Sequence, residues 1–164
     1  MSASETEGTN KTVGSVAEAW WKGLESRTGA RARLKRSGSI LELALEPETH
    51  VLKRQLFAVP DLKASIEIVA LVAGVLTWID DRSSLSPGVQ LGKLADKQSS
   101  IEPRFLRLLK EDRNSGDDLL TQWRRILALL KGSANPGALA ETLFYWGDSQ
   151  KKQLATEFYE NVSR

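Results

Sequence analysis

Basic side chains are the residues of this sequence whose types and spacing most directly indicate a chemical role. Residues 27–36 read R-T-G-A-R-A-R-L-K-R and contain five cations and no acid. The whole chain of 164 residues has a formal net charge of only +2, so positive charge is concentrated in this segment. Five cations on one short helix repel one another unless anions, a partner or solvent offset the charge. The pattern therefore predicts a surface for a polyanion.

Two further groups of cations follow later in the chain. One lies on a helix expected after Pro103, and the other is a pair of adjacent arginines. Arginine outnumbers lysine in all three groups, and a guanidinium group can bind phosphate through two parallel hydrogen bonds. The residues expected to bind nucleic acid are Arg31, Arg33, Lys35, Arg36, Arg104, Arg107, Lys110, Arg113, Arg124 and Arg125.

The expected mode of binding is contact with the phosphate backbone, without recognition of bases. The sequence has no zinc-finger spacing, basic zipper, RNP-type strand motif or helix-turn-helix pair with a polar recognition helix. The alternative for these cations is intramolecular pairing, with Asp112, Asp117, Asp118 and Glu141 as candidate acids. About a third of the cations are expected to pair in this way.

Catalytic and metal-binding chemistry has little support in the residue types present. The chain has no cysteine. It has one histidine, His50, but no Gly-x-Ser-x-Gly motif whose serine a histidine could activate. The pairs Asp80–Asp81 and Asp117–Asp118 are adjacent residues whose carboxylates diverge on a helix. A glycine-rich phosphate loop is also absent from the sequence. We therefore expect a binding protein without catalytic residues, metal, cofactor or small-molecule substrate.

The composition predicts one helical domain. An apolar content of 41% is enough for a sizeable core in a chain of this length. Residues 1–12 are mostly small, polar or acidic and are expected to form a disordered tail, followed by a single helical domain over residues 13–164. No alternating strand, signal peptide or membrane span is expected, and the lack of cysteine agrees with a cytoplasmic location.

The most apolar segment is expected to be the central helix of an all-α bundle. This helix is predicted from Leu62 to Asp80, with Asp61 as its N-cap. Because the segment is hydrophobic on nearly all sides, other helices must surround it. The complete bundle is expected to contain about eight or nine short helices.

Capping and breaking residues predict where the surrounding helices begin and end. The capping-box spacing from Ser15 to Glu18 predicts a helix over residues 16–26. Pro47 is expected to open a second helix, and Pro103 a third that starts at Arg104.

The later helices have similar signals. Asp117 is expected to cap the helix that carries the arginine pair, and Gly132 to close it. Asn135 is expected to cap the next helix, which opens at Pro136. Gly92 is expected to lie where another element approaches closely, because glycine has no side chain.

Six short segments also form an ordered set: Trp20-Trp21, A-R-A-R-L-K-R (30–36), L-G-K-L-A (91–95), R-F-L-R-L-L (104–109), W-R-R-I-L (123–127) and Y-W-G (145–147). This set resembles the CasB family, the small subunit of the type I-E CRISPR Cascade complex. The resemblance covers nearly everything after residue 12, in the right order and with similar spacing.

The resemblance implies an all-helical, non-enzymatic subunit, present in two copies inside a crRNA-guided complex. Its implied partners are the backbone subunits that hold the guide, the large subunit, a second copy of itself, the crRNA and the target DNA. Its implied role is to steady target DNA and the displaced strand of the R-loop. The cations that would carry this role are Lys35, Arg36, Arg104, Arg107, Lys110, Arg113, Arg124 and Arg125, followed by Arg31 and Arg33.

Two other functions fit a basic helical protein. A free-standing helical nucleic-acid-binding protein without sequence specificity would bind duplex DNA tightly on its own, whereas a Cascade subunit would bind weakly alone. A helical enzyme or ligand-binding protein would need an apolar pocket with converging polar groups, for example near Trp78 or Trp146.

Overall fold

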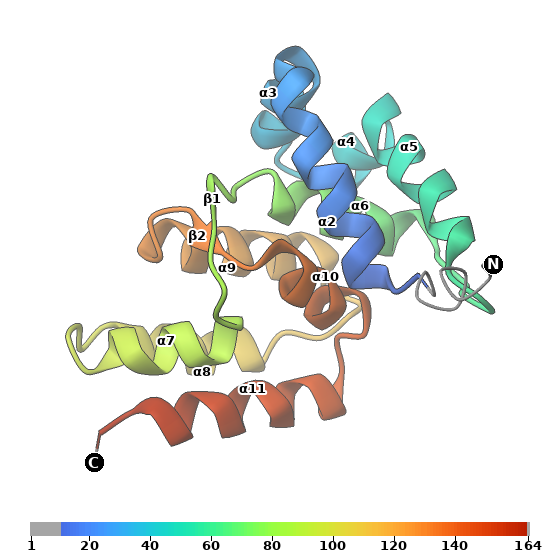
Figure 1. Cartoon of the computed structure of the whole chain (residues 1–164). Coiled ribbons are helices and arrows are strands. Elements are labelled where there is room, and N and C mark those ends of the chain that lie inside the picture. The colour runs from blue at the N-terminus through green and yellow to red at the C-terminus, as the bar shows by residue number, and fades with distance from the viewer. Residues whose placement is uncertain (1–10, 164) are drawn as a thin grey trace, which may run out of the picture.

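The computed structural model describes residues 11–163, and their regular structure is almost entirely helical (Figure 1). The predicted all-α class is confirmed. These residues form α2 (Val13–Gly23), α3 (Thr28–Arg36), α4 (Ile40–Ala44), α5 (Pro47–Gln55), α6 (Ile66–Leu76), α7 (Pro87–Ala95), α8 (Ile101–Leu109), α9 (Gly116–Leu129), α10 (Pro136–Phe144) and α11 (Asp148–Asn161). Two 3-10 turns, η1 (Leu24–Ser26) and η2 (Leu56–Ala58), follow α2 and α5. The predicted disordered tail lies mainly outside the described residues.

The predicted central helix exists but is shorter at both ends. In α6 every residue from 68 to 76 is buried, and burial of each large aliphatic side chain stabilises the fold by about 1.5–3 kcal/mol. Ser65 caps the helix by accepting a hydrogen bond from the backbone N–H of Ile68. The prediction of Asp61 as the cap was wrong, because its backbone is left-handed, with φ of 59°.

Other helices surround α6, as its uniform hydrophobicity requires. Helices α3, α4, α5, α9 and α10 all pack against it. Figure 1 shows α2 to α6 as one group, and α7, α8 and α11 as a second group at the other end of the molecule. Helices α9 and α10 lie between the two groups, and α11 packs along α7.

A very short parallel sheet departs from the expectation that no strand would form. Strand β1 (Asp81–Arg82) pairs with β2 (Ser133–Ala134). The two segments follow α6 and α9, so the pairing joins the C-terminal ends of two core helices. Strands of two residues are too short to show an alternating pattern, so no sequence signal predicts them.

Helix starts differ from the sequence prediction by a few residues. Helix α2 begins at Val13 because Thr12, rather than Ser15, is its N-cap, and the two side chains form a reciprocal capping box. Helix α8 begins at Ile101, two residues before Pro103. Both shifts lengthen a helix at its N-terminal end.

Helix α9 also starts earlier, after Ser115, so the prediction of Asp117 as its cap was wrong. The Asp117 carboxylate instead accepts a hydrogen bond from the backbone N–H of Ile40, at 2.8 Å. The predicted signals at Gly132 and Asn135 are confirmed. Gly132 has φ of 75°, and the Asn135 side chain accepts a hydrogen bond from Ala138 N–H at 3.0 Å.

Gly92 allows the close contact between α7 and α11. A Cβ atom at this position would lie 2.9 Å from Asn161 Cβ and would overlap the backbone carbonyl oxygen of Phe158. The predicted close approach is therefore confirmed, and the obstructing atom belongs to the backbone, which cannot rotate away.

We expect Gly92→Ala to lower the free energy of unfolding by about 1–3 kcal/mol, because α7 and α11 must separate. The clash outweighs the better helix propensity of alanine, which is worth about 1 kcal/mol. Urea denaturation measures the change. Gly38→Ala is the matched control, since a Cβ there meets nothing within 4 Å. Equal effects of the two substitutions would contradict this account of the packing.

Candidate nucleic-acid interface

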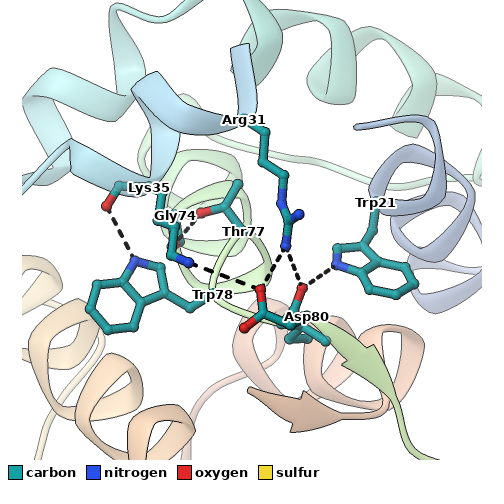
Figure 2. Close-up of polar contacts among 8 residues, drawn as sticks. Trp21, Arg31, Lys35, Gly74, Thr77, Trp78 and Asp80 are labelled. Carbon is teal, nitrogen blue, oxygen red and sulfur yellow. Dashed lines mark hydrogen bonds and ion pairs between the residues drawn. The ribbon is translucent and has the colours of Figure 1, made fainter. Parts of the chain in front are cut away.

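Arg31 and Lys35 lie one turn apart on α3, and both approach the carboxylate of Asp80 (Figure 2). Arg31 Nη2 lies 3.0 Å from Asp80 Oδ1, and Lys35 Nζ lies 3.9 Å from the same atom. Arg31 also donates a hydrogen bond to the carbonyl of Ile79, at 2.9 Å. The Asp80 side chain is 56% exposed, so water screens these pairs and each contributes at most about 1 kcal/mol.

Two of the other cations in this segment, Arg27 before α3 and Arg33 within it, also form ion pairs, whereas Arg36 at the C-terminal end of α3 forms none with the described residues. Arg27 contacts Glu48 and Arg33 contacts Glu46, at 3.1 and 3.0 Å. Arg36 is exposed and has no acidic partner among residues 11–163. Acids from the start of α5 and from the segment after α6 therefore offset most of the charge on this helix.

The acids proposed from the sequence are not the ones that pair. In the described part of the chain, no ion pair involves Asp112, Asp117, Asp118 or Glu141. Glu141 instead accepts a hydrogen bond from the backbone N–H of Gly14, at 2.7 Å, where α10 crosses α2. No local pattern predicts that Glu46, Glu48 and Asp80 contact α3, because they come from other segments of the fold.

Helix α8 carries a second group of cations in a different setting. Its buried side chains include Phe105 and Leu108, while Arg104, Arg107 and Lys110 are exposed on the opposite side. Within residues 11–163 none of these three cations has an ion-pair partner. These three cations thus face solvent without an ion pair to any described residue.

Arg113 lies beyond the end of α8 and is held in place by the backbone. It is exposed, and its Nη2 donates a hydrogen bond to the carbonyl of Phe144 at 2.7 Å. This bond leaves the charge of the guanidinium uncompensated by any acid in the described part of the chain.

Arg124 is buried, with 8% of its surface exposed, and so it is not part of a basic surface. Its guanidinium donates hydrogen bonds to the carbonyls of Leu34 and Ser37 at the end of α3, and to the carbonyl of Gly74 in α6. The last carbonyls of a helix lack the i+4 N–H partner, and a carbonyl oxygen can accept a second hydrogen bond, so Leu34 and Gly74 accept from Arg124 in addition to Ser37 N–H and Thr77 Oγ1. Arg124 was expected to contact nucleic acid. The structure corrects this expectation, because the guanidinium is buried and binds the protein backbone instead.

Trp78 lies against the guanidinium of Arg124, whose Cζ is 5.1 Å from the centre of the indole ring. Burial lowers the pKa of Arg124 to about 10. Neutral pH is well below that value, so the group remains charged. The indole N–H of Trp78 donates to the carbonyl of Lys35 at 3.2 Å, which fixes the orientation of the ring (Figure 2).

Arg125 follows Arg124 directly but faces solvent. Adjacent residues on a helix point about 100° apart, so one side chain is buried and the next is exposed. The predicted groups of cations also do not merge into one surface. Helix α3 lies at one end of the molecule and α8 at the other (Figure 1).

A pocket of about 610 Å³ lies where the start of α6 meets the loop before α9. Its lining mixes Ile68 and Leu71 with Glu67, Arg113 and Asp118, and it includes neither Trp78 nor Trp146, near which the ligand-binding alternative places a pocket. Among residues 11–163 there is no cluster of three or more potential metal ligands. No described helix is long and apolar enough to cross a membrane.

These features define a small helical protein with separate cationic surfaces. A family model for the CRISPR-associated protein Cse2 matches residues 30–159. The chain therefore belongs to the Cse2 family, also named CasB, which is the small subunit of type I-E Cascade. The resemblance seen in the sequence is confirmed.

Two solved structures from Thermus thermophilus have a similar fold. One is CasB, which is 26% identical, with a TM-score of 0.68, and the other is a CRISPR-associated protein of the Cse2 family, also 26% identical, with a TM-score of 0.69. Each alignment covers 90% of this chain and 97% of the other. No curated protein matches this sequence.

We expect Arg124→Met to lower the free energy of unfolding by about 2–4 kcal/mol, because it removes the buried hydrogen bonds that join α9 to the carbonyls of Leu34, Ser37 and Gly74. Arg125→Met is the matched control and should change stability by less than about 0.5 kcal/mol. Urea denaturation with circular dichroism measures both values. If the two variants are equally stable, the hydrogen bonds of Arg124 do not hold the helices together.

Proposed function

We propose that this chain is a non-catalytic, cytoplasmic subunit of a crRNA-guided complex, in which it holds the R-loop open. Family membership supports the place in the complex. The three cations on the outer side of α8 are the observation that supports the contact with DNA, because they are exposed and none of them forms an ion pair within the described residues. Phosphates would supply the missing negative charge.

The energetics of an R-loop make such modest contacts effective. The guide heteroduplex is about as stable as the DNA duplex that it replaces, so small contributions from protein contacts to the backbone decide which form persists. Cations bound along the displaced strand would slow its re-pairing with the target strand. We assign this role to Arg104, Arg107 and Lys110, with Arg113 at the end of the same surface.

The cations of α3 and α9 contribute unequally to the proposed contact. Arg36 and Arg125 are exposed without an acidic partner in the described part of the chain, and we include them. Arg31, Arg33 and Lys35 would first exchange a carboxylate for a phosphate. Because these pairs are partly exposed, the exchange costs little.

Exposed apolar side chains support a place in a larger assembly rather than a free-standing role. Leu41 and Leu45 lie one turn apart, on α4 and at its C-terminal end, and are 69% and 72% exposed. Adjacent apolar groups on a surface are typical of protein contacts. Guide-holding subunits, the large subunit and a second copy of the chain are the proposed partners.

Reconstitution of a guide-loaded type I-E complex with and without this chain tests the proposal. The chain should co-purify with the complex, and permanganate should modify thymines of the displaced strand for longer when it is present. A complex that excludes the chain, or an open strand of unchanged lifetime, would refute the proposed role. Tight binding of the isolated chain to duplex DNA would favour the free-standing alternative.

The double substitution Arg104→Glu and Arg107→Glu should shorten the lifetime of the open strand without unfolding the protein. Loss of two phosphate contacts should also make the log–log salt dependence of single-strand binding shallower by about 1.4. The matched control reverses two exposed cations outside the proposed interface, Arg54→Glu with Lys63→Glu. If both double variants release the strand equally fast, the effect follows net charge and the assignment to α8 fails.

A further inference from the structure

Trp78 is a partly exposed tryptophan that contacts cations from two of the basic groups. Arg124 of α9 lies against the ring at 5.1 Å, and Lys35 Nζ of α3 lies 6.0 Å from the ring centre. Trp20, Trp123 and Trp146, in contrast, are buried in the core. The surroundings of Trp78 therefore combine a flat aromatic surface with positive charge at the protein surface.

Interactions with other segments of the chain fix the position of the indole ring. Its N–H donates to the carbonyl of Lys35, and the guanidinium of Arg124 beside it is buried and held by three carbonyls. A cation against an aromatic ring in a desolvated site is worth about 2 kcal/mol. A ligand that stacks on the ring would therefore meet a surface that is already ordered, which reduces the entropic cost of binding.

The side chain of Lys35 is held much less firmly than that of Arg124. It is 45% exposed, and its ammonium lies at the outer limit of an ion pair with Asp80, at 3.9 Å. Such a pair is worth less than about 1 kcal/mol, so a phosphate group can replace the carboxylate at little cost. The site thus offers one rigid ring and one adaptable cation beside it.

We propose that Trp78 is a stacking platform for one unpaired base of a single-stranded nucleic acid, with Lys35 binding the neighbouring phosphate. This inference rests on the proposed function and adds a contact to a base, where the sequence predicted contacts to phosphates only. Bases in a duplex stack on each other, whereas bases of a single strand are free to stack on an aromatic side chain. The displaced strand of an R-loop is unpaired and therefore meets this requirement.

Any of the four bases can stack on the ring, because every base has a flat aromatic face. The platform therefore provides affinity without sequence specificity. This property suits a subunit of a complex in which pairing with the guide RNA supplies the sequence recognition.

The proposal is tested by measuring the anisotropy of a labelled oligothymidine as the full-length chain binds it at low salt. The oligonucleotide is about as long as the stretch of single strand that one protein covers. Trp78→Leu should weaken binding on the order of tenfold, and Trp78→Phe should restore most of the loss. Both substitutions remove the indole hydrogen bond to Lys35, so only the aromatic surface differs between them. If Trp78→Phe binds as weakly as Trp78→Leu, the ring has a structural role and the proposal is wrong.

An abasic oligonucleotide of the same length and charge provides an independent test on the unmodified protein. The wild-type chain should bind it on the order of tenfold more weakly than oligothymidine, and Trp78→Leu should bind the two equally. Equal binding of both oligonucleotides by the wild-type chain would overturn the proposal even if the Trp78 variants do not fold. Failure of the wild-type chain to bind oligothymidine at all would also overturn it.

The same assay separates this inference from the proposed function. If Arg104→Glu with Arg107→Glu weakens binding while Trp78→Leu and the abasic oligonucleotide have no effect, the phosphate contacts stand and the stacking platform does not. If the double charge variant binds as well as the wild type, the assignment of α8 to the interface fails instead.

Discussion

The guanidinium of Arg124 joins the C-terminal ends of two helices that are distant in the sequence. Helices α3 and α6 end close together, and the last backbone carbonyls of each carry a partial negative charge. Two such ends repel each other in a buried site unless a cation lies between them. Arg124 supplies that cation and hydrogen-bonds Leu34, Ser37 and Gly74, so it fixes α9 against both helices. The ring of Trp78 and the cations of α3 take their positions from this arrangement.

The distribution of counter-ions divides the positive charge of the protein into two kinds. Most cations of α3 are paired with acids, including Glu46 and Asp80, and these pairs hold that helix against the start of α5 and the segment after α6. The cations of α8 lack such partners in the described residues and cost electrostatic free energy in the isolated protein. The stability of the fold does not require the cations of α8 to lack ion-pair partners. The proposed role as a phosphate-binding surface accounts for the difference.

Prediction from the sequence succeeded where the information is local. The all-α class and the closing glycine at position 132 follow from patterns within a few residues, and so does the cap at Asn135. Helix boundaries were less accurate, because several residues compete as caps and tertiary contacts select among them. Asp117 shows the effect, since its carboxylate binds the backbone at Ile40 and Ser115 takes the position before the helix. The ordered set of basic and aromatic segments was enough to indicate the family.

The sequence by itself determined the helical class, the location of the basic segments and the family. The tertiary structure alone decided which of the described cations are buried, which are paired and which lack an acidic partner. The charge of an arginine is a property of one residue, but its burial and its counter-ions depend on segments that meet only after folding. Arg31 contacts Ile79, 48 residues away, and Arg124 contacts Leu34, 90 residues away. No pattern within a short stretch of sequence encodes contacts over such separations.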